Sequence, residues 1–308
     1  MARFIRSLVV ASVSLFAAFF ASSLAPTTTV GQSASPAEDY RLGILYFQGL
    51  SVPQNYQKAA ALFRLAAVTG DPHAQFLLGY LYANGFGVHQ DFVRAAELYR
   101  TAAVQGLAYA ENNLASLYQH GQGLPKSLTE AARWYLAAAM QGSPAAQTNL
   151  ATLYLNGEGV QQDFEQAAHW FRLAAEAGQP DAQNNLSSMY VSGQGVPRDY
   201  HEAFRWARKA AEQNLPVAQS NLAYLYEHGL GVPLDYSAAF TWYSRAARLG
   251  KRDAWSRLAS LRQIMTPRQI EQATTILSAS LQTVPTAPSP SASCPHSTTL
   301  CNLQPTDY

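Results

Sequence analysis

Residues 73–108 read HAQFLLGYLYANGFGVHQDFVRAAELYRTAAVQGLA, and this stretch contains two helical patterns separated by a glycine-containing loop. The apolar side chains of the first pattern recur every three or four residues, at Ala74, Leu78, Leu81 and Tyr82. That spacing places them on one face of a helix. Gly85 and Gly87 interrupt the pattern, and Asp91 stands where a side chain can cap the next helix. The stretch therefore predicts a helix–turn–helix unit.

The same unit recurs with a period of 36 residues, and six copies run from Ala37 to Arg252. The cap position is filled by Asn55, Asp91, Ser127, Asp163, Asp199 and Asp235. The position that ends the second helix is filled by Gly70, Gly106, Gly142, Gly178, Asn214 and Gly250, residues that tolerate a left-handed backbone. Pro72, Pro144, Pro180 and Pro216 follow two residues later, where the second helix can no longer continue.

A short period of this kind predicts stacked helix pairs, because one pair cannot bury its apolar face alone. We therefore expect an all-α, right-handed α/α solenoid of six helix-turn-helix repeats over residues 37–252. Residues 253–281 should cap it with two helices, the second beginning at Thr266-Pro267, since proline is favoured at the first helical position.

The repeat resembles the Sel-one-like repeat family, a relative of the tetratricopeptide repeat. One copy matches the family pattern at Ala146, Asn149, Leu150, Tyr154, Gly157, Gly159, Val160, Asp163, Ala167, Trp170, Phe171, Ala174, Ala175 and Gly178. The first copy departs from it, with Arg41 in place of Asn and Ser51 in place of the second loop glycine. The resemblance implies a non-catalytic adaptor or scaffold that binds protein or peptide partners.

Composition and motifs exclude several other classes of function. Lys plus Arg number 21 against 20 Asp plus Glu, so the net charge is +1, and we expect no nucleic-acid partner. The chain carries no His-Glu-x-x-His, Gly-x-Ser-x-Gly or Ser-x-x-Lys motif, and we expect neither an enzyme nor a cofactor or metal. The alternative is an enzyme or ligand-binding protein acting on peptidoglycan or β-lactams, suggested only by exported relatives.

The two ends of the chain differ in composition from the repeats. Arg3 and Arg6 precede an apolar run over residues 8–24, which predicts a signal peptide at 1–25 followed by a linker at 26–36. The alternative is an uncleaved anchor in the inner membrane, because such a run just suffices to span a bilayer. In either case we expect an exported protein, periplasmic or secreted, with a membrane contact only if the segment stays uncleaved.

Residues 282–308 are rich in proline, serine and threonine, and they carry no charged side chain before Asp307. A segment of this composition buries too little apolar surface to offset the entropy of ordering, so we expect a disordered tail. Cys294 and Cys301 lie within it, and in an oxidising compartment they could form a disulfide with each other.

The partner-binding surface is expected on the first helices, opposite the apolar stripe. Positions four, eight and eleven of each copy share this face. It is predicted to include Tyr40, Phe47, Phe76, Tyr80, Asn112, Ser116, Gln119, Thr148, Thr152, Asn184, Ser188 and Tyr224. In a helix-pair solenoid this face lines the concave side. Its aromatic side chains would anchor a peptide, and its amides and hydroxyls would bond the peptide backbone. Replacing Phe76 and Tyr80 should then leave stability nearly unchanged.

Two further columns of the repeat have a structural interpretation. Trp134, Trp170, Trp206 and Trp242 recur in the second helices, and we expect them to pack between neighbouring copies. Asn113, Asn149, Asn185 and Asn221 recur on the first helices, where structural hydrogen bonding is favoured over ligand contact.

Overall fold

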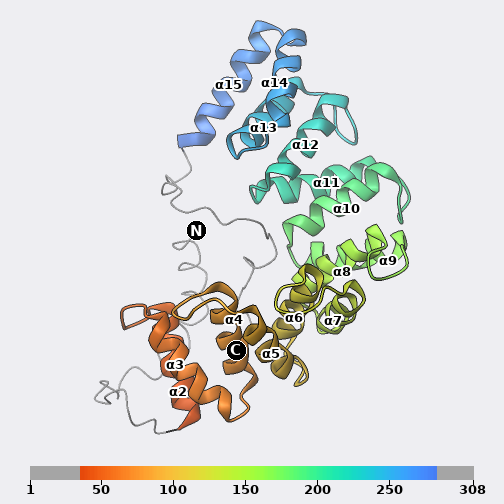
Figure 1. Ribbon diagram of the computed structural model, residues 1–308. Coiled ribbons are helices and arrows are strands. Elements are labelled where there is room, and N and C mark those ends of the chain that lie inside the picture. The colour runs from red at the N-terminus through yellow and green to blue at the C-terminus, as the bar shows by residue number, and fades with distance from the viewer. Residues whose placement is uncertain (1–34, 283–308) are drawn as a thin grey trace. The chain divides into compact units, whose positions relative to one another are not determined.

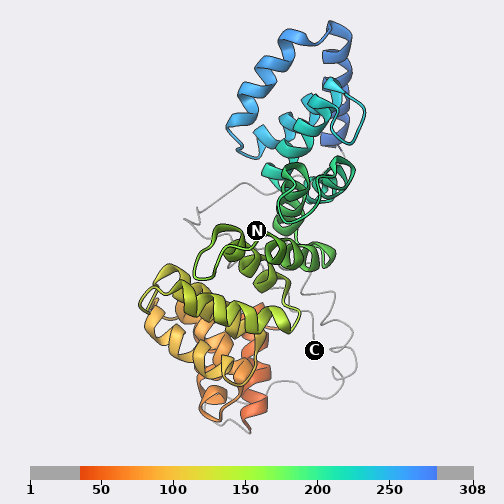
Figure 2. The same ribbon diagram turned by 90° about the vertical axis from the view of Figure 1, so that its right-hand side faces the viewer.

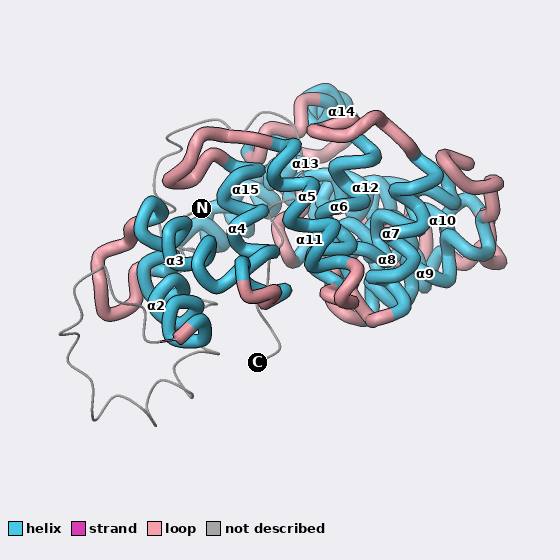
Figure 3. The backbone as a smooth tube through the Cα atoms, turned by 60° about the horizontal axis from the view of Figure 1, so that its bottom comes forward, coloured by secondary structure: helices cyan, strands magenta, loops and turns pink. Residues whose placement is uncertain are grey.

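The computed structural model describes residues 35–282, and within that range every regular element is a helix (Figures 1 and 3). The predictions for the signal peptide and for the disulfide of the tail lie outside the described residues. The chain divides after Ala138 into two compact units, which we call unit one (residues 35–138) and unit two (residues 139–282) and describe separately.

The helices of unit one are α2 (Pro36–Gln48), α3 (Tyr56–Val68), α4 (Pro72–Asn84), α5 (Phe92–Ala103), α6 (Ala108–His120) and α7 (Leu128–Met140), which ends two residues past the boundary. Those of unit two are α8 (Pro144–Asn156), α9 (Phe164–Glu176), α10 (Pro180–Ser192), α11 (Tyr200–Glu212), α12 (Pro216–His228), α13 (Tyr236–Arg248), α14 (Asp253–Ile264) and α15 (Pro267–Gln282). Within each unit, a helix packs chiefly against the helices next to it in the chain. The predicted helix pairs are therefore confirmed.

The second helix of every copy begins at the predicted cap. The Asn55 side chain accepts a hydrogen bond from the Lys58 amide at 3.0 Å, and Asp163 accepts one from Gln166 at 2.9 Å. Ser127, which stands where four other copies have an acidic cap, also caps its helix, since its hydroxyl oxygen accepts a hydrogen bond from the Glu130 amide at 3.2 Å. These bonds satisfy amide groups that have no partner inside the helix.

The second helices end where the glycine column predicts. Gly178 has a φ of 94° and Asn214 a φ of 64°, so both adopt the left-handed conformation. The prolines that follow do more than prevent the helix from continuing, because Pro180 and Pro216 are the first residues of α10 and α12. The first copy starts the same way, at Pro36 with Ser35 as its cap, one residue before the predicted boundary.

The two loop glycines have different roles. Gly85 ends α4 with a φ of 69°, whereas Gly87 lies against the start of α3 in the preceding copy. A β-carbon at Gly87 would overlap the backbone of Tyr56 and Gln57, so only glycine allows the two copies to approach this closely. Ser51 occupies the equivalent position in the first copy, before which the described part of the chain holds no second helix.

The core of each unit consists of small residues on both helices and, in five of the six second helices, one large ring at the same position, where α11 carries Ala207 instead. Phe63, Tyr99, Tyr135, Phe171 and Tyr243 are fully buried. The tryptophans one residue earlier are less central than predicted: Trp206 is buried, but Trp134, Trp170 and Trp242 are only partly buried at the edge of the core. The neighbouring ring, rather than the tryptophan, packs against the first helix of its own copy, where Phe63 lies against Gly43 and Tyr99 against Gly79.

Two helices follow the last copy, as the sequence predicts, and they appear in blue in Figure 2. Thr266 caps α15, its hydroxyl accepting a hydrogen bond from the Gln269 amide at 3.3 Å. Both α14 and α15 pack against α13 through residues such as Ala254, Leu258, Leu261 and Ala273. Among the described residues, no helix combines the length and the apolar character needed to cross a bilayer.

Candidate partner-binding surface

The predicted surface of unit one contains a cluster of aromatic rings. The ring centre of Phe47 lies 6.1 Å from that of Tyr80 and 5.6 Å from that of Tyr56. Phe86 stacks on Tyr56 at 5.1 Å and remains partly exposed. The structure thus brings the predicted residues Phe47 and Tyr80 together and adds two that sequence reasoning missed. The signal for Phe86 was its position between the two glycines of the loop.

Phe76 does not belong to an exposed surface. Only 7% of it is accessible to solvent, and its ring centre lies 5.8 Å from that of Tyr99 and 5.9 Å from that of Tyr109. The prediction that it is exposed on the partner-binding surface is therefore wrong, and its burial argues against the expected small effect on stability. Tyr109 belongs to the next copy, so position four is covered by a neighbour that one helical wheel does not include.

Some polar residues of the predicted surface are buried, and others are accessible to solvent. Asn112, Ser116 and Asn184 are buried, which corrects their assignment to a partner-binding role. Thr148, Thr152 and Ser188 are at least partly accessible, but each hydroxyl donates to a carbonyl four residues earlier in its own helix, at 2.8, 2.9 and 3.1 Å. Their oxygen atoms can still accept a hydrogen bond.

Gln119 also has an internal partner. Its side-chain oxygen accepts a hydrogen bond from the Tyr135 hydroxyl at 2.8 Å. Tyr40 is partly buried as well and packs against the core, its ring centre 6.0 Å from that of Phe63. Several side chains predicted to contact a partner therefore serve the packing of the repeats themselves.

A hollow of about 300 Å³ remains between α10 and α12 in unit two. It is lined by Ser187, Ser188, Val191, Asn221, Tyr224 and Leu225. Tyr224 is 37% exposed and its ring centre lies 4.1 Å from that of His228. The Asn221 amide donates to the Asn184 side-chain oxygen at 2.8 Å, which holds the two first helices together. Two predicted residues, Ser188 and Tyr224, thus meet in one hollow.

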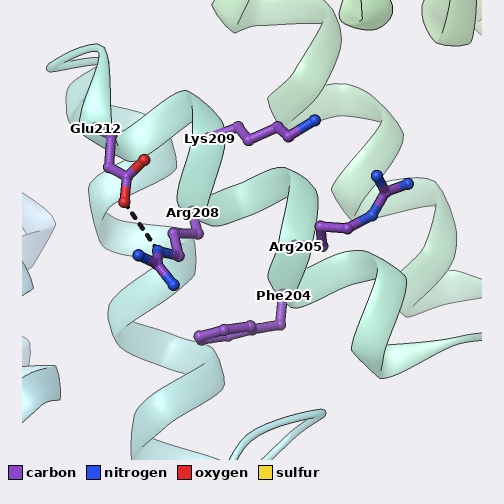
Figure 4. A pocket seen from close by; sticks show the side chains of 5 residues that line it. All are labelled: Phe204, Arg205, Arg208, Lys209 and Glu212. Carbon is purple, nitrogen blue, oxygen red and sulfur yellow. Dashed lines mark hydrogen bonds and ion pairs between the residues drawn. The ribbon is translucent and has the colours of Figure 1, made fainter.

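A second hollow, of about 330 Å³, lies on α11 and was not predicted (Figure 4). In Figure 4, Arg208 and Glu212 lie on one side of the helix, and Arg205 and Lys209 on the other. Arg208 donates to Glu212 at 2.8 Å. The sequence signal was Phe204, because the same position holds alanine in the four preceding copies. Its ring packs edge-on against Tyr226 at 5.2 Å.

The titration of several groups is shifted by their surroundings. Burial raises the pKa of Tyr99 and of Tyr135, since a phenolate ion is poorly solvated in the core. The pKa of Tyr82 is lowered instead, chiefly by the hydrogen bond that Arg64 donates to its hydroxyl. The described residues contain no group of three or more His, Cys, Asp or Glu side chains suited to a metal ion.

Comparison with known proteins places this arrangement among repeat proteins. The family model described as Sel1 repeat matches residues 39–67, 72–107, 108–143, 144–179, 180–215 and 216–251. A Sel1 repeat protein from Oxalobacter formigenes is 31% identical, with a TM-score of 0.68 over 76% of this chain and 96% of the other. The c5321 protein, a protective antigen of uropathogenic Escherichia coli strains with an SLR fold, is 28% identical, with a TM-score of 0.56 over 85% of this chain and 66% of the other. A search of the curated proteins found no match.

Proposed function

Since this chain belongs to the Sel1 repeat family, whose repeats generally mediate protein–protein interactions, we propose that it is an exported, non-catalytic scaffold for a protein or peptide partner. The proposed contact lies on the first helices of unit two, at the hollow between α10 and α12. The proposed contact involves fewer residues than the twelve that the sequence pattern predicts.

The observation that carries the proposal is the chemistry of that hollow. Val191 and Leu225 form the apolar part of the wall of the hollow, and the exposed Tyr224 ring adds a flat aromatic surface. Ser188 and Asn221 add polar atoms at the rim. A volume of about 300 Å³ is at the lower end of the range for ligand sites, and it suits one apolar or aromatic side chain of a peptide.

The absence of a charged group among these lining residues has a consequence for binding. Electrostatic attraction contributes little where both surfaces are neutral, so affinity should depend only weakly on salt. A peptide with a central apolar side chain and uncharged residues on either side of it fits this surface best. Packing against Tyr224 would then supply most of the binding free energy.

The experiment first identifies a partner by chemical crosslinking and pull-down from the native cell envelope. Affinity is then measured for the parent chain, for Tyr224→Ala and for Leu234→Ala, an exposed loop residue outside the hollow. We expect Tyr224→Ala to weaken binding by about 2 kcal/mol and Leu234→Ala to leave it unchanged. Equal affinity for all three proteins would place the binding surface elsewhere.

Export is tested separately. A reporter enzyme that is active only outside the cytoplasm, fused after Tyr308, should be active in cells. Replacing Leu15 and Phe19 with Asp interrupts the apolar run and should abolish that activity, because charged residues strongly disfavour insertion. An inactive parent fusion contradicts export. N-terminal sequencing of the mature protein distinguishes a cleaved signal peptide from an anchor.

A further inference from the structure

Positive charge is concentrated at the end of unit two. Residues 245–268 contain seven basic side chains, at Arg245, Arg248, Lys251, Arg252, Arg257, Arg262 and Arg268. One acidic residue, Asp253, lies among them, and it is paired with Lys251 at 3.1 Å. These 24 residues therefore hold a third of the basic side chains of a chain whose net charge is only +1.

Large apolar side chains are exposed in the same region. Trp255 is 60% exposed, in contrast to the buried or partly buried tryptophans of the repeats. Leu249 and Ile264 are also more than half exposed. A large exposed apolar side chain that adjoins other recognition groups is a mark of an interaction surface.

One face of α14 carries both kinds of side chain. At 3.6 residues per turn, Arg252, Trp255, Ala259 and Arg262 fall within about 80° of arc. Ala254, Leu258 and Leu261, which are centred about 110° around the helix from this face, are buried against the rest of unit two. The exposed face is thus held outward by the packing of the other face. Arg262 lies over the Phe240 ring at 5.4 Å, and neither Arg252 nor Arg262 forms an ion pair among the described residues.

We propose that this face of α14, which we call the basic–aromatic face, binds the surface of a bilayer that contains anionic phospholipids. The guanidinium groups of Arg252 and Arg262 would pair with headgroup phosphates, and the Trp255 ring would enter the boundary between headgroups and acyl chains. Tryptophan favours that boundary, and each basic residue near an anionic surface adds to the attraction. The contact is independent of the N-terminal apolar segment and of the proposed scaffold role.

A lipid surface fits these residues better than other polyanions do. Nucleic acid would use the arginines, but it offers no apolar layer for Trp255. The boundary of a bilayer offers both partners at once, because phosphates and acyl chains are a few ångströms apart there. Anionic lipid is therefore the partner that fits this face best, and binding to DNA or to polyglutamate instead would overturn the proposal.

The test uses the full chain with Leu15→Asp and Phe19→Asp, so that the N-terminal apolar run cannot insert. Sedimentation is measured with vesicles of phosphatidylcholine alone and of phosphatidylcholine mixed with phosphatidylglycerol. We expect binding only to the mixed vesicles, with a partition coefficient that falls as NaCl is added. Binding that is equal for both vesicle types, or absent from both, contradicts the proposal.

Variants then locate the contact. Replacing Arg252 and Arg262 with Gln should lower the partition coefficient about twenty-fold, and Trp255→Ala about ten-fold. The control replaces Arg94 and Arg133, two exposed arginines of unit one, with Gln and so changes the net charge by the same amount. It should alter the partition coefficient less than about two-fold. Thermal melting confirms that each variant is folded. Equal losses in both arginine pairs would show a non-specific charge effect and overturn the assignment to α14.

Tryptophan fluorescence provides a second measurement. Insertion of Trp255 should shift the emission to shorter wavelength when mixed vesicles are added, and Trp255→Phe should abolish the shift while the four other tryptophans remain. An unchanged shift in Trp255→Phe would show that another region meets the lipid.

Discussion

The Nη2 atom of Arg100 donates a hydrogen bond to the hydroxyl oxygen of Tyr118 at 2.9 Å. Arg100 belongs to the second helix of one copy and Tyr118 to the first helix of the next, so the bond joins two copies. The relationship recurs between Arg172 and Tyr190, at 3.3 Å. The same bond joins Arg64 to Tyr82 at 3.2 Å, so it accounts for the tyrosine at this position in three of the copies.

Removing that bond should weaken the joint between copies. We expect Tyr118→Phe to lower the free energy of unfolding by about 1 kcal/mol, because a hydrogen bond to a charged group is lost. A double-mutant cycle with Arg100→Met, followed by urea denaturation, isolates the pair. Tyr200→Phe, at a hydroxyl that makes no such bond among the described residues, is the control. Additive losses in the cycle would show that the bond contributes nothing.

Substitution of the glycine at the second loop position should destabilise the fold far more than substitution of the glycine at a helix end. Gly178 and Gly195 both have positive φ, at 94° and 69°, but only Gly195 lies against a neighbour, the backbone of Phe164. We expect Gly178→Ala to cost about 1 kcal/mol and Gly195→Ala roughly 1–3 kcal/mol more. Thermal melting of both variants measures the difference. Equal melting temperatures would contradict the close approach of the two copies.

Phe76 should behave as a core residue. Phe76→Ala is expected to lower the free energy of unfolding by about 3–5 kcal/mol, since a buried ring is replaced by a cavity. Phe86→Ala removes an equal side chain that is 37% exposed, and should cost about 1 kcal/mol. Urea denaturation compares the two. A loss for Phe76→Ala no larger than that for Phe86→Ala would restore the surface assignment.

Buried tyrosines should make the fold sensitive to alkali. Burial raises the pKa of Tyr135 in the folded state, whereas an unfolded tyrosine titrates near its ordinary value of about 10. The stabilisation is therefore complete below about pH 10 and is lost as the pH rises toward the folded-state pKa. We expect Tyr135→Phe to flatten the decline of melting temperature above that pH, and Tyr224→Phe, at an exposed ring, to leave it unchanged. An identical decline in all three proteins would contradict the prediction.

The sequence predicted the helix boundaries well because they depend on local chemistry. Asn55 and Asp163 cap helices through bonds that span three residues, and Asn214 ends one through its own backbone conformation. Such signals can be identified in one copy without knowledge of its neighbours. The residues of the partner-binding surface were predicted less well, because their exposure depends on how adjacent copies pack.

Two features show why this packing was missed. Phe76 contacts Tyr109, which lies 33 residues later, so no helical wheel of a single copy places the two together. Gln183 donates to the Ala175 carbonyl at 3.0 Å and accepts from Gln213 at 2.9 Å, and it is buried although hydropathy marks it as a surface residue. The signal that could have identified it was the recurrence of glutamine at this position in four copies.

Ser51 also limits how an array of this kind can lengthen by gene duplication. A duplicate of residues 37–72 inserted later in the chain would place a serine β-carbon where Gly87 and Gly195 meet the backbone of the preceding copy. A duplicate of residues 181–216 would instead carry Gly195 with it and reproduce the existing joint. Internal recombination can therefore lengthen the array by 36 residues at a time if it duplicates a later copy, whereas the first copy fits only at the beginning of the series.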